Sequence, residues 1–234
     1  MPDFYRIFSW ACEASNRFFE EDPLINQLKI IVSKEISNNI GHGYHHATKV
    51  AIESGALVLI EAKQMHYSRD ATLRRLLLVQ CAGLFHDIKR QQSSHAQKGA
   101  AYSRDILKRY PFENGEVDDI CIAIENHEAF KEVTRLVNPD SILISDCLYD
   151  GDKFRWGPDN FLYTIWDMVT FLNIPLYQFI DHYPKGMQLL SKIKHTFRTT
   201  IGKEYGPQFI DIGIGVGEKV FDMICDEFVD SASH

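Results

Sequence analysis

Histidine and aspartate side chains stand at or near the ends of apolar segments in several parts of this 234-residue sequence. The apolar run of residues 76–85, for example, passes directly into a His-Asp pair. Apolar segments are held in a core, so polar groups at their ends must face a shared interior or a cleft. Burying an ionised carboxylate there is costly unless something pairs with it. The residues placed in this way are His46, His86, Asp87, His127 and Asp146.

A divalent metal ion would remove that cost. Imidazole nitrogens and carboxylate oxygens together suit Zn, Mn, Fe, Co or Ni. A dication would neutralise Asp87 and satisfy the neutral imidazoles around it. One histidine at a helix end is usually an ordinary capping or hydrogen-bonded residue, but chance does not readily produce the whole set. The spacing therefore predicts a metal site.

Three histidines cluster at the start of the helical segment 44–64. His45 and His46 cannot both face inward, because neighbours on a helix lie ~100° apart. His46 shares its helical face with uncharged residues, whereas the face of His45 includes Lys49. This pattern favours His46 as the ligand. His42 lies between two glycines in the entering loop, so we expect it to line the pocket, with direct metal binding as the alternative.

His46, the His86–Asp87 pair and Asp146 together resemble the H…HD…D signature of the HD-domain superfamily of metal-dependent phosphohydrolases. The stretches HHATKVA, GLFHDIKR and ILISDCLYDGDKF are also similar to family segments. The resemblance covers roughly residues 40–160. It implies an all-α HD-domain bundle whose ligands come from several helices, with accessory helices at both ends of the chain.

Two more histidines fall between the His-Asp pair and the last aspartate of the signature. They are His95, in SSHAQKGAAYS, and His127, in ENHE. Family members with such histidines tend to hold two metals. The resemblance thus implies one or two divalent ions (Mn, Fe, Co, Ni, Zn or Mg), with Asp87 as the bridge between them. Asp150 or Asp152 could support the ligands, although carboxylates in this kind of segment are more often solvated loop charges.

Cations near the His-Asp pair predict phosphate binding. Lys89 and Arg90 follow the pair directly, and Arg90 stands where the family has a phosphate-binding lysine. A guanidinium can hold phosphate through two hydrogen bonds. Lys153 and Arg155 lie in the loop-like segment DGDKFRWGPDN and could add further cations, although each of these four could also be a solvated charge. The predicted catalytic residues are Asp87, Lys89 and Arg90, and the predicted substrate-binding residues are His42, Arg90, Lys153 and Arg155.

Three functions fit these residues. The first is hydrolysis of a small phosphorylated metabolite or nucleotide. The second is oxygenation of a substrate C–H bond by a mixed-valent di-iron centre, because histidine and carboxylate suit iron as well as manganese. The third is a non-catalytic module that keeps the fold. It ranks last, because missing ligands would be its mark and all the candidate ligands are present.

Helical periodicity dominates the elements that must position these residues. Two shorter segments, 115–127 and 139–150, contain β-branched runs that could be strands, although neither alternates cleanly. We expect one all-α domain over residues 1–234 with an HD core at about 40–160. The predicted helices cover residues 3–19, 23–37, 44–64, 69–88, 96–110, 160–175, 187–206 and 207–229.

Composition narrows the partners and the compartment. The net charge of -7 argues against general nucleic-acid binding, which usually needs a basic face. The N-terminus lacks the order of a signal peptide, and residues 76–85 are too short to span a membrane. The five scattered cysteines favour free thiols in a reducing compartment. We expect a cytoplasmic protein that binds a small phosphorylated substrate and no membrane, and that could form a homodimer.

Overall fold

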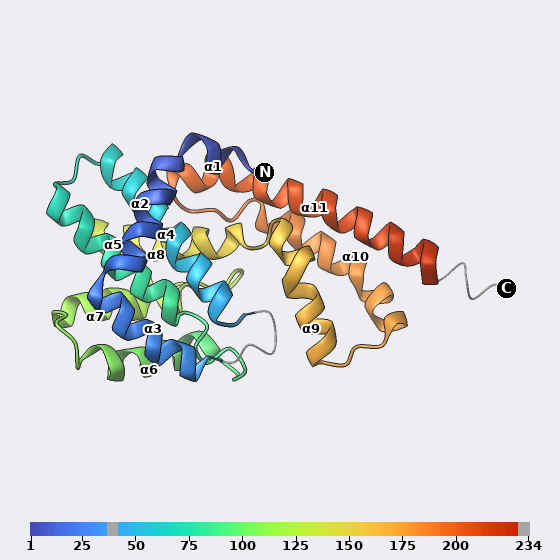
Figure 1. Cartoon of the computed structure of the whole chain (residues 1–234), viewed down its shortest axis with the longest axis horizontal. Coiled ribbons are helices and arrows are strands. Elements are labelled where there is room, and N and C mark those ends of the chain that lie inside the picture. Colours follow the sequence, from blue (N-terminus) through green and yellow to red (C-terminus); the bar gives the residue numbers. More distant parts are fainter. Residues whose placement is uncertain (37–41, 229–234) are drawn as a thin grey trace.

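The computed structural model describes residues 1–36 and 42–228, and every regular element in those ranges is helical (Figure 1). The all-α prediction is confirmed, and the two segments that could have been strands are helices α7 and α8. The elements are α1 (Asp3–Ile7), α2 (Ser9–Glu21), α3 (Pro23–Glu35), α4 (Tyr44–Gln64), α5 (Arg69–Phe85), α6 (His95–Leu107), α7 (Asn114–Glu125), α8 (Pro139–Phe154), the π-helical turn η1 (Asn160–Thr164), α9 (Ile165–Phe171), α10 (Leu176–Ile193) and α11 (Thr200–Phe228).

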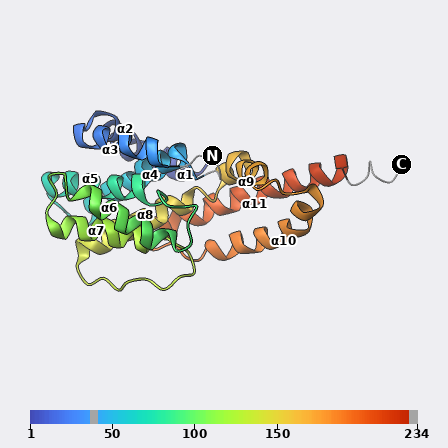
Figure 2. The ribbon, with the colours of Figure 1, turned by 90° about the horizontal axis from the view of Figure 1, so that it is seen from below.

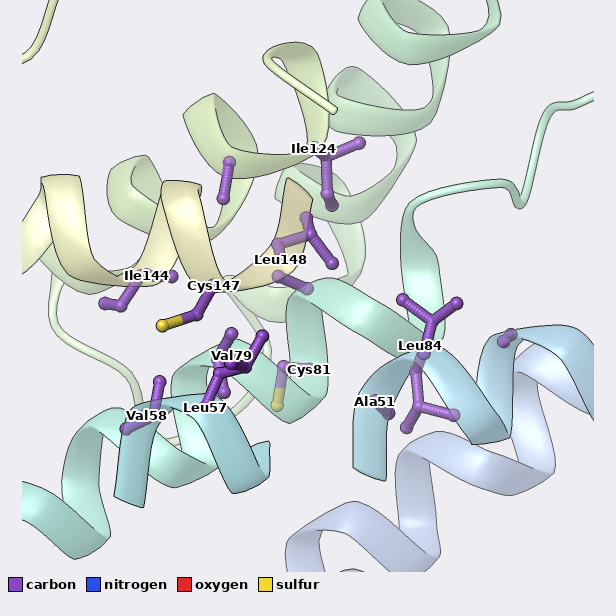
Figure 3. Close-up of a cluster of buried hydrophobic side chains, with 14 of the residues drawn as sticks. Ala51, Leu57, Val58, Val79, Cys81, Leu84, Ile124, Ile144, Cys147 and Leu148 are labelled. Atoms are coloured by element: carbon purple, nitrogen blue, oxygen red, sulfur yellow. The ribbon is translucent and has the colours of Figure 1, made fainter. Parts of the chain in front are cut away.

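Helices α4, α5, α7 and α8 enclose the core. Every residue from Leu76 to Phe85 of α5 is buried, as expected for a helix that is apolar on all sides. Figure 3 shows side chains from these four helices meeting in one apolar cluster. Among them are Ala51, Leu57, Val58, Val79, Cys81, Leu84, Ile124, Ile144, Cys147 and Leu148. The helices that carry the predicted ligands are thus fixed by packing.

Two glycines let neighbouring helices approach α4 closely. A Cβ atom on Gly83 of α5 would lie 2.5 Å from Cα of Ala51, and one on Gly151 of α8 would lie 2.8 Å from the backbone nitrogen of Ser54. Neither position has room for a side chain. Because α4, α5 and α8 all carry candidate ligands, this close contact brings those ligands within reach of one another.

Replacing Gly83 by alanine should therefore loosen the contact between α4 and α5. We expect Gly83→Ala to lower the free energy of unfolding by about 1–3 kcal/mol, the usual cost of overpacking a core. Gly215→Ala is the matched control, since Gly215 lies inside α11 with nothing within 4 Å of the added Cβ. That control should gain about 0.5–1 kcal/mol from helix propensity. Urea denaturation measures both, and a stabilised Gly83→Ala protein would contradict the packing argument.

Helix α1 packs against the first part of α11 on the core. The backbone nitrogen of Asp3 donates to Oε1 of Gln208 at 2.6 Å, and Nε2 of Gln208 donates back to Oδ2 of Asp3 at 3.0 Å. Phe4 of α1 meets Phe154 of α8, whose ring stacks on Phe209 of α11 at 4.1 Å. Helices α1 and α11, from opposite ends of the sequence, therefore both contact the same aromatic ring of α8.

Helices α9, α10 and α11 extend from one end of the core (Figures 1 and 2). The sequence predicted one helix over 187–206, but α10 ends at Ile193 and α11 begins at Thr200. Tertiary hydrogen bonds cause this break. Asp150 accepts from the backbone nitrogens of Arg198 and Thr199, at 2.8 Å each, and so holds the chain at the entry of α11. The predicted helix ends at residues 37 and 229 lie outside the described residues.

Two further observations concern the cysteines and the membrane. All five cysteines are free, and burial raises the pKa of the Cys147 thiol well above its usual value. Within residues 1–36 and 42–228, no helix combines the length and the apolar character needed to cross a membrane.

Candidate metal centre

His86 and His127 occupy equivalent places, just past the C-terminal ends of α5 and α7. The last carbonyls of a helix lack partners within it. His86 donates its Nδ1–H to the carbonyl of Gly83 at 2.7 Å, and His127 donates its Nδ1–H to the carbonyl of Ile124 at 2.6 Å. These partners assign the tautomers. Each Nε2 therefore faces the interior, where it could bind a metal, and this is the usual arrangement of a metal-binding histidine.

His46 and His95 face these two histidines from the first turns of α4 and α6. Nε2 of His46 lies 3.3 Å from Nε2 of His86, and Nε2 of His95 lies 3.3 Å from Nε2 of His127. Burial lowers the pKa of His46 to about 4 and that of His95 to about 4. Both imidazoles are consequently neutral at pH 7, the form that binds metal.

Asp87 lies between the two histidine pairs and turns one oxygen toward each. Its Oδ2 is 3.4 Å from Nε2 of His86 and 3.9 Å from Nε2 of His46. Its Oδ1 is 3.4 Å from Nε2 of His95 and 3.5 Å from Nε2 of His127. Burial alone would raise the pKa of Asp87, but the surrounding imidazoles hold it well below its usual range. One ionised carboxylate thus spans both pairs.

The hydrogen bonds of these groups leave a deficit that a divalent metal would fill. Oδ1 of Asp87 is buried without a hydrogen-bond partner. Nε2 of His95 accepts from Arg90, and Nε2 of His127 lies 3.3 Å from the same nitrogen. Ligand nitrogens on one tetrahedral zinc ion are roughly 3.3 Å apart, since each lies ~2.0–2.1 Å from the metal. The donor set therefore fits a metal.

Two groups of donors can be separated. The first group has one residue from α4, one from the end of α5 and one from α8. The second group consists of Asp87, His95 and His127. Within each group the donor atoms lie within 4.8 Å of one another. The groups are His46, His86 and Asp152, and Asp87, His95 and His127. The structure thus brings together five of the six predicted ligands.

The structure places Asp152, rather than the predicted ligand Asp146, beside the histidines. Oδ1 of Asp152 lies 3.3 Å from Nε2 of His46 and 3.8 Å from Nε2 of His86. Asp146 instead has a side chain 28% exposed and lies 4.0 Å from Arg198. Both aspartates are on α8, where six residues turn the side-chain direction by ~240°. Only one of them can face the histidines.

The two aspartates offer a direct comparison on one helix. We expect Asp152→Asn to weaken metal binding at least as much as the loss of an outer partner does, about 10–100-fold. Asp146→Asn should bind metal as the wild type does. Metal content by mass spectrometry and titration calorimetry measure both. Metal loss in the Asp146→Asn protein together with normal binding in Asp152→Asn would reverse the assignment.

Of the two cations that follow the His-Asp pair, Arg90 reaches the cluster and Lys89 does not. Arg90 donates from a terminal guanidinium nitrogen to Nε2 of His95 at 2.9 Å. Nζ of Lys89 lies 3.6 Å from the carboxylate of Glu35 and 3.9 Å from the ring centre of Tyr102. The structure therefore corrects the catalytic role predicted for Lys89, whose side chain turns toward α3 and α6.

Lys153 is buried, which corrects its predicted role in substrate binding. Its Nζ donates to the backbone carbonyl of His127 at 3.0 Å and pairs with the carboxylate of Asp152. Burial alone would raise the pKa of Asp152, but Lys153 and His46 hold it well below its usual range. Lys153 thus keeps one carboxylate ionised and fixes the turn that carries His127.

Arg155 is also buried, and carboxylates already engage it. It donates to Asp159 at 2.6 Å and to the hydroxyl of Tyr5 at 2.6 Å, and it pairs with Glu53. Its side chain nevertheless lines the cavity beside the cluster. Contact with substrate therefore stays a prediction for Arg155, while the ion pairs are a structural role that the sequence did not indicate.

A cavity of about 520 Å³ opens beside the cluster. His42, His46 and Arg90 line its polar end, and Nδ1 of His42 lies 2.9 Å from Oδ2 of Asp87. This position agrees with the expectation that His42 is a pocket residue, and it also places His42 in a possible donor set with His46 and Asp87. His45 is exposed, as the helix-face argument predicted.

Comparison with known proteins gives one match. A family model described as "HD domain" matches residues 40–156, a range that contains every donor of the cluster from His46 to Asp152. No curated protein and no solved structure matches the chain.

Proposed function

Because the chain belongs to the HD-domain family, whose members are typically metal-dependent phosphohydrolases, we propose that it hydrolyses a phosphate ester through a dinuclear metal site. The position of Asp87 carries this proposal. Its two oxygens divide between two sets of imidazoles, as a carboxylate bridging two ions must do. Two ions that share one bridge suit an in-line displacement at phosphorus.

The chain's own residues supply the rest of the reaction. Bound divalent ions lower the pKa of a water toward about 7 and neutralise phosphoryl oxygens. Arg90 cannot donate to His95 while His95 serves as a ligand, so its guanidinium becomes available for a phosphate oxygen. The oxygen of water bonds to phosphorus, and the bond from phosphorus to the ester oxygen breaks. The proton that the water gives up would pass to His42, at the cavity wall, and from His42 to that leaving oxygen.

Metal analysis followed by a substrate panel tests this function. Protein purified without chelator should contain divalent metal, approaching two ions per chain when loaded. Loaded with Mn, Co, Ni, Zn, Fe or Mg in turn, it should release phosphate or alcohol from some phosphomonoester, phosphodiester or nucleotide. If no metal supports hydrolysis of any compound in the panel, the proposal is wrong.

Oxygenation by a di-iron centre is the second candidate, and one observation favours it. Of the four cations predicted to hold phosphate, Arg90 alone lies at the cluster without being buried, and it already donates to His95 and lies 3.7 Å from Oδ1 of Asp87. The adjoining cavity is largely apolar, which also suits a C–H substrate. Oxygen consumption by iron-loaded protein, with an EPR signal that oxygen alters, would support this function. Hydrolysis with Mn or Co and no oxygen uptake would exclude it.

A further inference from the structure

We infer that the substrate is a phosphate ester whose alcohol part is a long, mostly apolar group; this inference rests on the proposed phosphohydrolase function. The metal cluster forms only one end of the cavity of about 520 Å³. His42, His46 and Arg90 stand at that end, where the ester group must react. The remainder of the cavity must hold the rest of the substrate, so its lining indicates what that part is.

The far walls come from η1, α9 and α10, outside the range that the family model matches. Phe161 and Ile165 line one side, and Phe179, Met187 and Leu190 line the other. Among the described residues, no Asp, Glu or Lys lines the cavity, and both of its arginines, Arg90 and Arg155, come from the HD core side rather than from these helices. A largely apolar wall continuous with a reactive polar end fits a substrate built in the same way.

A nucleotide fits these walls poorly. A base or ribose buried there would leave polar groups without partners, which costs binding energy. The hydroxyl of Tyr183 already donates to the carbonyl of Gly217, and the other polar side chains on the far walls are Asn160, Thr164, Gln178 and His182. None of them is a permanent charge that could hold a second phosphate. Methionines at Met168 and Met187 instead provide flexible apolar surface that adapts to a chain.

A chain-length series on the metal-loaded protein tests the inference. The probes are non-hydrolysable n-alkylphosphonates from butyl to decyl, used below their micelle concentrations. Affinity should rise by up to about fourfold per methylene, because burial of each one is favourable by ~0.8 kcal/mol. The heat-capacity change should become more negative along the series. Equal affinity for all chain lengths, or tighter binding of nucleoside monophosphates than of the decyl compound, would overturn the inference.

A helix glycine on the cavity wall provides the variant. A Cβ on Gly186 would have nothing within 4 Å, so Gly186→Trp extends into open space without displacing the core. We expect this variant to lower the ratio of kcat/KM for octyl phosphate to kcat/KM for ethyl phosphate at least tenfold. Gly215→Trp is the matched control, since its Cβ is equally free but it does not line the cavity, and it should keep the wild-type ratio.

The outcomes separate this inference from the proposed function. Turnover of phosphate esters without any chain-length preference would support the hydrolase function and contradict the apolar substrate. Phosphonate binding that strengthens with chain length, with no ester hydrolysed under any metal, would keep the apolar site and remove the hydrolase. An unchanged octyl-to-ethyl ratio in Gly186→Trp would also count against the apolar substrate site.

Discussion

Asp87→Asn is expected to lower turnover by about a thousandfold or more, because it removes the charge that would hold the ions of the proposed dinuclear site. Asparagine has nearly the same shape but keeps only one oxygen. An amide NH₂ group would then replace one carboxylate oxygen. If it replaced Oδ1, it would lie 3.4–3.5 Å from Nε2 of His95 and His127. If it replaced Oδ2, it would lie 3.4–3.9 Å from Nε2 of His86 and His46. Metal content should fall along with activity, since the group of Asp87, His95 and His127 loses its carboxylate.

Three measurements separate this effect from unfolding. Metal content by mass spectrometry, phosphate release and helical circular dichroism are compared between Asp87→Asn and Asp119→Asn. Asp119 is a partly buried carboxylate that accepts from Ser141, away from the cluster. The control should keep its metal and its activity. Wild-type metal content and turnover in Asp87→Asn would show that Asp87 does not bridge metals.

Most of the site follows from one rule that can be applied to the sequence. Polar residues at the ends of buried helices must face a common interior or cleft. His86 and His127 obey it in the same way, each donating to a carbonyl three residues earlier, which fixes Nε2 toward the cluster. The choice of His46 over His45 follows from the charge on the two helix faces. These features are local, so the sequence alone predicts them. The all-helical fold is predictable for the same reason.

The last ligand could not be chosen in this way. Residues Cys147 to Phe154 of α8 are all buried, so burial does not distinguish Asp152 from Asp150. Asp152 also lies beyond the segment 139–150 that was singled out from the sequence, whereas α8 continues to Phe154. Because α8 extends to Phe154, Asp152 lies on the helix. The rotation of α8 about its axis relative to α4 then turns Asp152 toward the histidines. That rotation depends on the packing of Gly151 against Ser54, a tertiary contact.

The helix break at residues 194–199 had a similar cause. The carboxylates of Asp150 and Glu61 capture backbone nitrogens of Arg198, Thr199 and Ile201 from distant parts of the core. No sequence feature within residues 194–199 indicates that distant carboxylates bind their backbone nitrogens. The positions of Lys89 and Lys153 could not be predicted for the same reason, because carboxylates of the fold, Glu35 and Asp152, engage them.

Arg155→Met is expected to lower the free energy of unfolding by about 3–5 kcal/mol, because it leaves the buried carboxylate of Glu53 without a cation. The side chains of Arg155 and Glu53 are each only 8% exposed. Burial raises the pKa of Glu53, and Arg155 is the main group that opposes this rise. Without the guanidinium, Glu53 must take up a proton or stay ionised in the interior, and the contact with Tyr5 of α1 is lost as well.

Two further variants isolate the ion pair. Arg104→Met, which breaks the more exposed pair with Asp118, should change stability by no more than about 1 kcal/mol. The double variant Glu53→Met/Arg155→Met should be less destabilised than Arg155→Met, because no unpaired charge remains. Urea denaturation measures all three. If Arg155→Met loses no more stability than Arg104→Met, the buried pair does not hold α1 to the core, and Arg155 is then available to bind substrate at the cavity wall as its sequence position first indicated.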